Sequence, residues 1–226
     1  MVTLVDRIRL AVFDMAGTTV DDTVEGVPLV LRSYDEAFRR HGIEVPMKTL
    51  NDNRGRDKWA VIKEFGGEKA SAVYRNFCEM LVSNTAKLKE MEGAGGVFKA
   101  LKERGVYVAV ESGFPALVTL GIIQHLRWQE DALIDYWTCS ELVDEERPSP
   151  AMIRHCMRHL HVRSPSEVVK VDDTAVGVEE GINAKAHTVA VLTGTQSREK
   201  LQAVKPDAIL PSVRELPAWL LEQKLL

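Results

Sequence analysis

Cysteine is scarce in this sequence, and long apolar runs are missing. Cys78, Cys139 and Cys156 are the three cysteines, an odd number at wide spacings. This pattern disfavours a disulfide framework and is typical of reduced thiols in the cytoplasm. No apolar run reaches about 18 residues, and the N-terminus lacks the charged-then-apolar pattern of a signal peptide. We therefore expect a cytoplasmic protein with no membrane segment.

An excess of basic charge is also missing. Lysine and arginine number 29 against 33 aspartates and glutamates, which gives a net charge of −4. No basic stripe with interleaved aromatic residues occurs, so nucleic acid is not an expected partner. The 226 residues are 45% hydrophobic and 27% charged, which is ordinary for a globular chain. This length suits one core domain with an insertion, or one large domain.

Short apolar runs recur along the chain and are typical of buried strands. They span residues 8–13, 106–110, 168–171, 188–192 and, as a shorter fifth run, 208–210. Helical patterns at residues 96–103, 116–126 and 150–160 separate several of these runs. Buried parallel strands are nearly continuous in apolar residues, and strands that alternate with helices form βαβ units. The sequence therefore predicts an α/β fold with a Rossmann-like parallel sheet.

Residues 22–90 break this alternation. They hold only helical patterns, with apolar residues at helical spacing in residues 27–41 and 73–88. A helical stretch between the first and second strands is typical of an inserted cap. We predict a helical cap at residues 22–90 and a core made of residues 1–21 and 91–226.

Asp14 stands directly after the first predicted strand and opens the segment Asp-Met-Ala-Gly-Thr-Thr. An aspartate there lies at the mouth of the sheet. Backbone N–H groups of the following turn, which includes Gly17 and Thr18, can hold phosphate oxygens at this place. The alternative is an aspartate that only caps a turn, as any junction between a strand and a helix can show. The segment alone leaves both interpretations open.

Polar residues also follow the other predicted strands. Ser112 and Gly113 offer a hydroxyl and a backbone N–H that a ligand can approach closely, and Arg147 precedes a helix as a fixed cation. Asp172 and Asp173 offer carboxylates for a metal ion, unless they form only a solvated turn. Because ligands bind outside the carboxyl ends of the strands in open α/β sheets, we expect these groups to meet.

A nucleophile, a hydroxyl, a cation and metal carboxylates in this order resemble the haloacid-dehalogenase superfamily over essentially the whole chain. The resemblance implies that Asp14 attacks phosphorus to form an aspartyl-phosphate, and that Ser112 and Arg147 bind the phosphoryl group. It also implies Mg²⁺ bound by Asp14, the backbone carbonyl of Ala16 and Asp173. Mg²⁺ prefers hard oxygen ligands, and phosphoryl transfer depends mainly on positioning and charge compensation, so these residue types suit the reaction.

Ala16 narrows the resemblance. Superfamily members usually carry a second aspartate two residues after the nucleophile, where it protonates a leaving alkoxide. Alanine cannot donate a proton, so cleavage of an ordinary phosphomonoester should lose about 10²–10⁴-fold in rate. Ala16, together with the following Gly-Thr-Thr and with Arg147 where lysine is commoner, resembles the phosphonatase (phosphonoacetaldehyde hydrolase) branch. That branch breaks a C–P bond, whose carbon leaving group requires no alkoxide acid.

The resemblance also implies an electron sink, the imine of a cap lysine three residues after a glycine. Lys58 has this spacing from Gly55. Asp57 is the expected N-cap of a helix that begins at Lys58, and Arg54 and Arg56 lie nearby in sequence. A helix N-terminus and neighbouring cations disfavour the ammonium form, and imine formation requires the neutral amine. The alternative is a solvent-exposed helix lysine.

Other positions depart from the phosphonatase pattern and leave the substrate open. Val61 stands where that branch has a histidine, and Arg54 stands where it has a methionine. Arg54 either binds an additional carboxylate of the substrate or is exposed. The functions that remain are a C–P hydrolase acting on phosphonoacetaldehyde or a related carbonyl phosphonate, a small-molecule phosphatase, and a non-catalytic phosphate-binding protein. The joint presence of the nucleophile, hydroxyl, cation and metal acid argues against the third.

The assembly state is a further expectation. Relatives of the phosphonatase branch pair through cap helices, and the helix predicted in residues 27–41 offers an apolar face. We therefore expect a homodimer.

Overall fold

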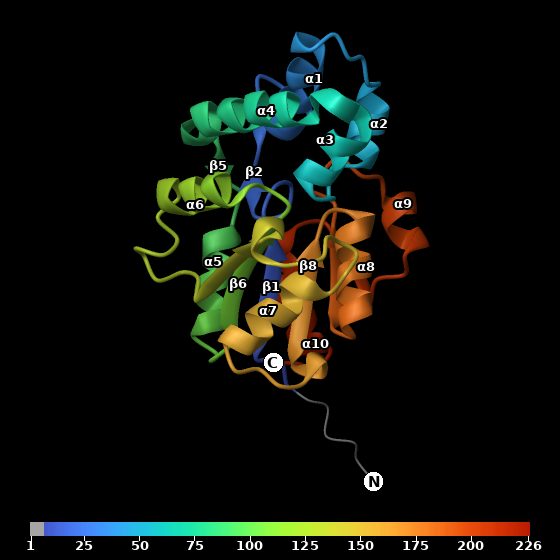
Figure 1. Ribbon diagram of the computed structural model, residues 1–226. Helices are drawn as coiled ribbons and strands as arrows, with labels where there is room; N and C mark the ends of the chain where they lie inside the picture. The colour runs from blue at the N-terminus through green and yellow to red at the C-terminus, as the bar shows by residue number, and fades with distance from the viewer. Residues whose placement is uncertain (1–6) are drawn as a thin grey trace.

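A six-stranded parallel sheet lies at the centre of the computed structural model, which describes residues 7–226 (Figure 1). Its strand order is β10-β9-β8-β1-β6-β7, and each neighbouring pair runs parallel. The strands span Leu10–Asp14 (β1), Tyr107–Ser112 (β6), Tyr136–Cys139 (β7), Val168–Asp172 (β8), His187–Val191 (β9) and Ala208–Leu210 (β10). The predicted α/β fold with a parallel sheet is confirmed. Residues 1–6 of the predicted core lie outside the described residues.

Strand β7 has no counterpart among the predicted strands. Its four residues, Tyr-Trp-Thr-Cys, are only partly buried in the first half. The strand lies at the edge of the sheet, where Trp137 pairs with Val110 of β6. An edge strand is not enclosed on all sides, so it needs no continuous apolar run. Pairing with β6 therefore decides its structure more than its own sequence does.

Helices cover both faces of the sheet, as strands that are apolar on both sides require. Phe13 points to one face, where its ring packs 5.1 Å from that of Phe98 in α5. Val12 points to the other face and belongs to a cluster with Ile153 of α7. The helices of residues 91–226 span Ala94–Lys102 (α5), Ala116–His125 (α6), Ala151–His159 (α7), Ala175–Ala184 (α8), Arg198–Ala203 (α9) and Leu216–Glu222 (α10).

Four helices from residues 22–90 lie together beyond the carboxyl edge of the sheet (Figure 1). They span Leu29–Arg40 (α1), Met47–Asp52 (α2), Lys58–Gly66 (α3) and Ala70–Asn84 (α4). A hairpin of two short strands, Thr23–Val24 (β3) and Val27–Pro28 (β4), precedes α1. Its two turn residues, Glu25 and Gly26, both have positive φ, the conformation that favours a two-residue hairpin loop. The expectation of a purely helical segment is therefore wrong at its start.

The apolar face of α1 is buried within this group of helices. Tyr34 and Phe38 of α1 are fully buried, and the ring of Tyr34 stacks 4.6 Å from that of Phe77 in α4. The proposed reason for a homodimer, an available apolar face on the helix in residues 27–41, is therefore wrong. The homodimer itself stays a prediction.

The chain passes between the sheet and these helices along two adjacent segments. Val20–Asp21 (β2) pairs antiparallel with Lys89–Glu90 (β5). Glu90 is fixed from the sheet side, because it accepts hydrogen bonds from Gly95 N and from Trp128 Nε1. The division into a core and a cap at residues 21/22 and 90/91 stays a prediction, and the paired segments lie at these positions.

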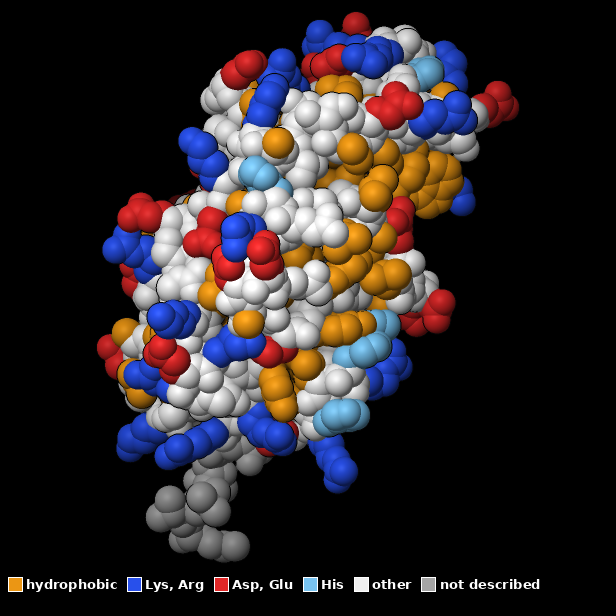
Figure 2. Space-filling view, turned by 90° about the vertical axis from the view of Figure 1, so that its left-hand side faces the viewer, with side chains coloured by type: hydrophobic (Ala, Val, Ile, Leu, Met, Phe, Trp, Pro, Cys, Tyr) orange, Lys and Arg blue, Asp and Glu red, His pale blue; other side chains and the backbone are white. Residues whose placement is uncertain are grey.

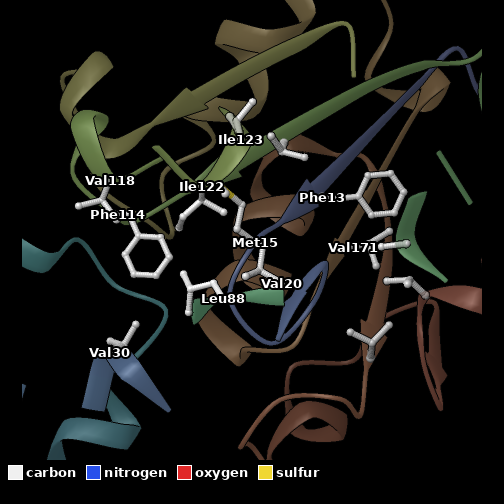
Figure 3. Packing of buried hydrophobic residues seen from close by; sticks show 14 of the residues in the cluster. Phe13, Met15, Val20, Val30, Leu88, Phe114, Val118, Ile122, Ile123 and Val171 are labelled. Atoms are coloured by element: carbon white, nitrogen blue, oxygen red, sulfur yellow. The ribbon is translucent and has the colours of Figure 1, made fainter. Parts of the chain in front are cut away.

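Apolar contacts continue from the sheet into the helical group. Figure 3 shows Phe114 and Val30 close to Met15 and Leu88, all members of one buried cluster. On the face drawn in Figure 2, hydrophobic side chains gather mainly on the right-hand side. Within residues 7–226, no helix is both long and apolar enough to cross a membrane.

Candidate active site

The polar ends of the strands and the loop before α3 meet at one narrow cavity. Its free space is about that of one water molecule. The residues that line it come from both sides of the chain crossing: Asp14, Ala16, Val30, Arg54, Gly55, Lys58, Ser112, Gly113, Phe114, Arg147 and Thr174. Most of the predicted catalytic and binding residues therefore lie around one space. Gly17, Thr18 and Asp173 are not among the residues that line it.

The turn after β1 brings Asp173 into contact with Gly17 and Thr18. Three successive backbone N–H groups, beginning with that of Thr18, donate to the carbonyl of Met15 and close the turn. The Thr18 hydroxyl donates to Asp173 Oδ1 at 3.0 Å. Gly17 has φ +92°, and a Cβ there would lie 2.6 Å from Asp173 Oδ2. The turn thus needs a glycine to admit the carboxylate, and the Thr18 side chain faces that carboxylate.

Asp14 is buried at the end of β1 beside a cation and other acids. Its Oδ1 accepts a hydrogen bond from Arg147 Nη1 at 2.7 Å. Burial raises the pKa of Asp14 to about 6, with a further contribution from the negative charge of Asp172. The contact with Arg147 works in the opposite direction. A carboxylate in this setting is ionised near neutral pH, as a nucleophile must be.

Ser112 and Gly113 close the opposite wall of the cavity. The Ser112 oxygen accepts a hydrogen bond from Phe114 N at 3.0 Å, which leaves its hydroxyl hydrogen available to a ligand. A Cβ on Gly113 would lie 2.8 Å from the carbonyl oxygen of Arg56. Glycine at this position therefore lets the loop before α3 approach the sheet.

Arg147 is fixed by three carboxylates. Its Nη1 donates to Asp14, its Nη2 to Glu111 at 2.9 Å and its Nε to Glu180 at 2.7 Å. Burial alone would lower the pKa of Arg147, but nearby carboxylates, Glu180 first, outweigh burial and hold the pKa well above its usual range. The guanidinium is therefore a permanent cation beside the predicted nucleophile.

Three fully buried charged residues near Arg147 were not among the predicted site residues: Glu111, Lys170 and Glu180. Lys170 Nζ contacts the Glu111 carboxylate and lies 2.9 Å from Asp172 Oδ2. Two of these residues do carry a signal, because Glu111 and Lys170 interrupt strands that are otherwise apolar. A charge inside a buried parallel strand requires a partner, which indicates a charged cluster.

Three acids lie close enough together to hold a cation. Asp14, Asp172 and Asp173 each present a carboxylate oxygen within 4.8 Å of the others. Burial raises the pKa of Asp173 to about 8; Arg54 opposes this rise, whereas Asp14 and Asp172 add to it. Asp173 Oδ2 is buried and finds no hydrogen-bond partner within residues 7–226. Crowded carboxylates with an unpaired oxygen suit a hard divalent cation such as Mg²⁺.

Asp172 is bound differently from Asp173. Its Oδ1 accepts hydrogen bonds from Thr174 N at 2.9 Å and from Thr174 Oγ1 at 2.7 Å, and Lys170 lies beside its Oδ2. Both aspartates are fully buried. The alternative of a solvated turn is therefore wrong for this pair.

Lys58 is a buried lysine at the first position of α3. Asp57 caps the helix, because its Oδ1 accepts a hydrogen bond from Ala60 N at 2.7 Å. Lys58 is 4% exposed, and its Nζ donates to the carbonyl oxygens of Arg54 at 2.5 Å and Arg56 at 2.8 Å. Burial lowers its pKa to about 8. The alternative of a solvent-exposed helix lysine is therefore wrong.

The cations that act on Lys58 are not quite those expected. Arg147 and Arg54 help to lower the pKa of Lys58. The Arg56 side chain instead pairs with Glu64 at 2.9 Å and is partly exposed. Of the two arginines that precede Lys58, Arg54 therefore helps to lower its pKa, whereas Arg56 is not among its main causes.

Arg54 is buried beside Asp22 rather than exposed. Its Nη2 contacts the Asp22 carboxylate, and its Nη1 donates to Thr195 Oγ1 at 3.2 Å. Its Nε is buried and has no partner in the described part of the chain. Asp22 and Thr195 are contacts that the sequence did not predict, because they lie 32 and 141 positions away.

Comparisons with known proteins agree on the family. A family model described as haloacid dehalogenase-like hydrolase matches residues 8–185. The phosphonoacetaldehyde hydrolase of Bordetella pertussis is 28% identical over an alignment of 259 positions, which covers 96% of this chain and 92% of that protein. The phosphonoacetaldehyde hydrolase of Bordetella avium is 30% identical over 207 residues, which cover 82% of this chain and 72% of that protein.

Solved structures share the fold. A phosphonoacetaldehyde hydrolase-like protein from Oleispira antarctica superposes with a TM-score of 0.83 at 20% identity, covering 98% of this chain and 95% of that one. A predicted phosphatase from Clostridium acetobutylicum gives a TM-score of 0.80 at 20% identity, covering 96% of this chain and 100% of that one. At these identities the likeness establishes the architecture alone.

Proposed function

This chain belongs to the haloacid dehalogenase-like hydrolases, in their phosphonatase-like branch, and from that premise we propose that it cleaves the C–P bond of phosphonoacetaldehyde or a related carbonyl phosphonate. The observation that carries the proposal is Lys58, a buried amine in the wall of the cavity that Asp14 also lines. A plain phosphatase has no use for such an amine. A C–P hydrolase needs one to accept electrons from the departing carbon.

Lys58 carries the first step in this proposal. Its Nζ attacks the aldehyde carbon, and loss of water gives an imine. The carbonyl oxygens of Arg54 and Arg56 accept its two N–H groups, so the lone pair of a neutral amine is directed away from both. With a pKa near 8, about a tenth of the amine is neutral near pH 7.

Asp14 carries the second step. Its carboxylate attacks phosphorus, the C–P bond breaks, and the electron pair moves into the protonated imine to give a neutral enamine. Water then releases phosphate from the aspartyl-phosphate. The enamine takes a proton and is hydrolysed to acetaldehyde and free Lys58. Ala16 fits this sequence because no alkoxide requires an acid.

The phosphoryl oxygens need compensating charge and donors during the transfer. We assign this role to Arg147, the Ser112 hydroxyl and the backbone N–H group of Gly113. The N–H groups of Gly17 and Thr18, which the sequence suggested for this role, already donate to the carbonyl oxygens of Val20 and Met15 within the turn. Arg147 is the strongest member, since its guanidinium already contacts the Asp14 carboxylate.

Mg²⁺ would be held by Asp14, the main-chain carbonyl of Ala16 and Asp173. The unpaired Asp173 Oδ2 and the high pKa of that carboxyl group support this assignment. When bound, the ion would neutralise charge on the phosphoryl group. Asp172 would support the site through its contacts with Thr174 and Lys170 rather than as a free ligand.

We further propose that residues 22–90 form a cap that closes the site over the substrate. Arg54 would help to keep this cap closed. It is already partnered by Asp22 and Thr195, so its favoured role is to hold the loop before α3 near Asp173. This role replaces binding of an additional substrate carboxylate.

A cytoplasmic location fits three cysteines that are all unpaired.

Reductive trapping tests the proposal directly. Phosphonoacetaldehyde with borohydride should attach a reduced two-carbon or phosphonoethyl group to Lys58, located by peptide mass mapping. Lys58→Arg keeps the charge but cannot form an imine, so it should lose cleavage of the aldehyde. Lys63→Arg, an exposed lysine in the same helix, is the matched control and should keep it.

A second substrate separates the C–P hydrolase from the phosphatase. p-Nitrophenyl phosphate has a leaving group that scarcely needs protonation, so Lys58→Arg should retain any slow hydrolysis of it. If both activities instead change little and in parallel, with no adduct on Lys58, the imine mechanism is wrong. The small-molecule phosphatase then becomes the better account.

A further inference from the structure

Glu111 and Lys170 form a fully buried ion pair that does not line the cavity. Glu111 lies in β6 and Lys170 in β8, on either side of β1. The register places Glu111 beside Asp14 and Lys170 beside Val12, so both side chains leave the sheet on the face from which Asp14 projects. The pair therefore bridges the strand that carries the proposed nucleophile.

Arg147 depends on this pair for its orientation. One guanidinium nitrogen contacts Asp14, whereas the other two donate to Glu111 and Glu180, behind the cavity wall. Glu111 Oε1 accepts hydrogen bonds from both Arg147 and Lys170 Nζ. Lys170 Nζ also lies 3.7 Å from Glu180 Oε2, the oxygen that accepts from Arg147 Nε. Lys170 thus fixes the two carboxylates that fix the guanidinium.

Packing alone does not account for these charges. Burying an ion pair costs desolvation energy that the attraction between the charges often fails to recover, and apolar residues of similar volume are frequently more stable. The rest of this face supplies that apolar alternative, with Leu10, Val12 and Ala109 fully buried in the strands. A glutamate and a lysine in this setting need a reason other than filling space.

We propose that Glu111 and Lys170 are positioning residues that hold the guanidinium of Arg147 toward the phosphoryl group. The inference rests on the proposed function only in taking Arg147 as a phosphoryl-binding group. Without Glu111, the guanidinium is free to turn toward Asp172, whose Oδ2 already lies 3.7 Å from Nη1. A displacement of this kind costs rate because the donor no longer meets the transition state.

Three variants separate positioning from packing. Glu111→Gln and Lys170→Met each take one partner away from the buried charge that remains, so each should lower the unfolding midpoint. The double variant E111Q/K170M removes both charges and should regain much of that stability. Its kcat for p-nitrophenyl phosphate should nevertheless stay about 10–100-fold below wild type, with a smaller change in KM. Lys170→Arg, which keeps the charge, should restore part of the rate.

A double variant with wild-type stability and wild-type kcat would overturn the inference. If the double variant does not fold, Glu111→Gln alone decides, because it keeps the shape and one acceptor; a wild-type kcat in that variant overturns the inference too. If the wild-type protein hydrolyses neither substrate, the proposed function fails. Binding of inorganic phosphate in the presence of Mg²⁺ then still tests positioning. Glu111→Gln should weaken phosphate binding, as the loss of the guanidinium in Arg147→Met should. Unchanged phosphate binding in Glu111→Gln contradicts the inference.

Discussion

Burial lowers the pKa of the Lys58 amine to about 8 from its usual 10.5. Near pH 7 this difference raises the neutral fraction about 300-fold, from roughly 0.03% to roughly 9%. Because only the neutral amine forms an imine, the rate of reductive trapping by phosphonoacetaldehyde should rise about tenfold per pH unit below pH 8 and level off above it. The rate is measured by mass spectrometry of the reduced adduct with cyanoborohydride.

The same difference in pKa has a consequence for stability. A lysine whose folded-state pKa is depressed opposes folding most strongly below the folded pKa, and the opposition disappears as pH rises through the unfolded value of 10.5. At about 1.4 kcal/mol per pH unit, the cost near pH 7 is about 3 kcal/mol. Lys58→Met does not titrate, so its free energy of unfolding relative to wild type should fall by about this amount between about pH 7 and pH 11.

Urea unfolding at several pH values measures this change. Comparing the variant with wild type across pH cancels the constant loss of the hydrogen bonds to Arg54 and Arg56. Lys63→Met is the matched control, because Lys63 is exposed and its replacement should give a difference that does not change with pH. A pH-independent difference for Lys58→Met, or trapping that keeps rising to about pH 10, would refute the reasoning.

Four further outcomes are expected. Asp14→Asn should reduce turnover below about 1% of wild type while the thermal midpoint changes little, and greater residual activity in steady-state assays would contradict a covalent nucleophile. Mg²⁺ should bind more tightly as pH rises toward 8, with proton release in calorimetry, because the pKa of Asp173 lies near 8 without the ion; binding independent of pH would count against the site. Arg54→Met should cost about 3–5 kcal/mol in urea unfolding, since it leaves Asp22 buried without a partner, and D22N/R54M should recover part of the loss. Light scattering should give a homodimer of twice 25.2 kDa, and the mass of one chain at micromolar concentration would exclude it.

The sheet and the nucleophile were predictable because their signals are local. Largely apolar runs mark strands β1, β6, β8 and β9, and polar residues at the ends of the first three line the cavity. The family pattern placed Asp14 and Ser112 at these ends and Arg147 before α7, in chain order. Since parallel strands share one carboxyl edge, their convergence follows from topology.

The partners of these residues were not predictable in the same way. Arg54 meets Asp22 and Thr195, and the Lys58 amine meets carbonyl oxygens that become neighbours only when α3 begins at its capped position. Strand β7 likewise needs β6 beside it. These features depend on contacts between distant segments, which no short window of sequence contains.

Sequence alone determined the family, the order of the strands along the chain and the residue types that can act on phosphorus, because these are properties of short motifs and their spacing. Tertiary structure decided the burial and the pKa values of the side chains. Enclosure of Lys58 lowers its pKa, burial among acids raises that of Asp173, and packing of α1 against α4 covers the face that had suggested a dimer. Each of these depends on how much water and how many charges surround a side chain, and only the folded chain fixes both.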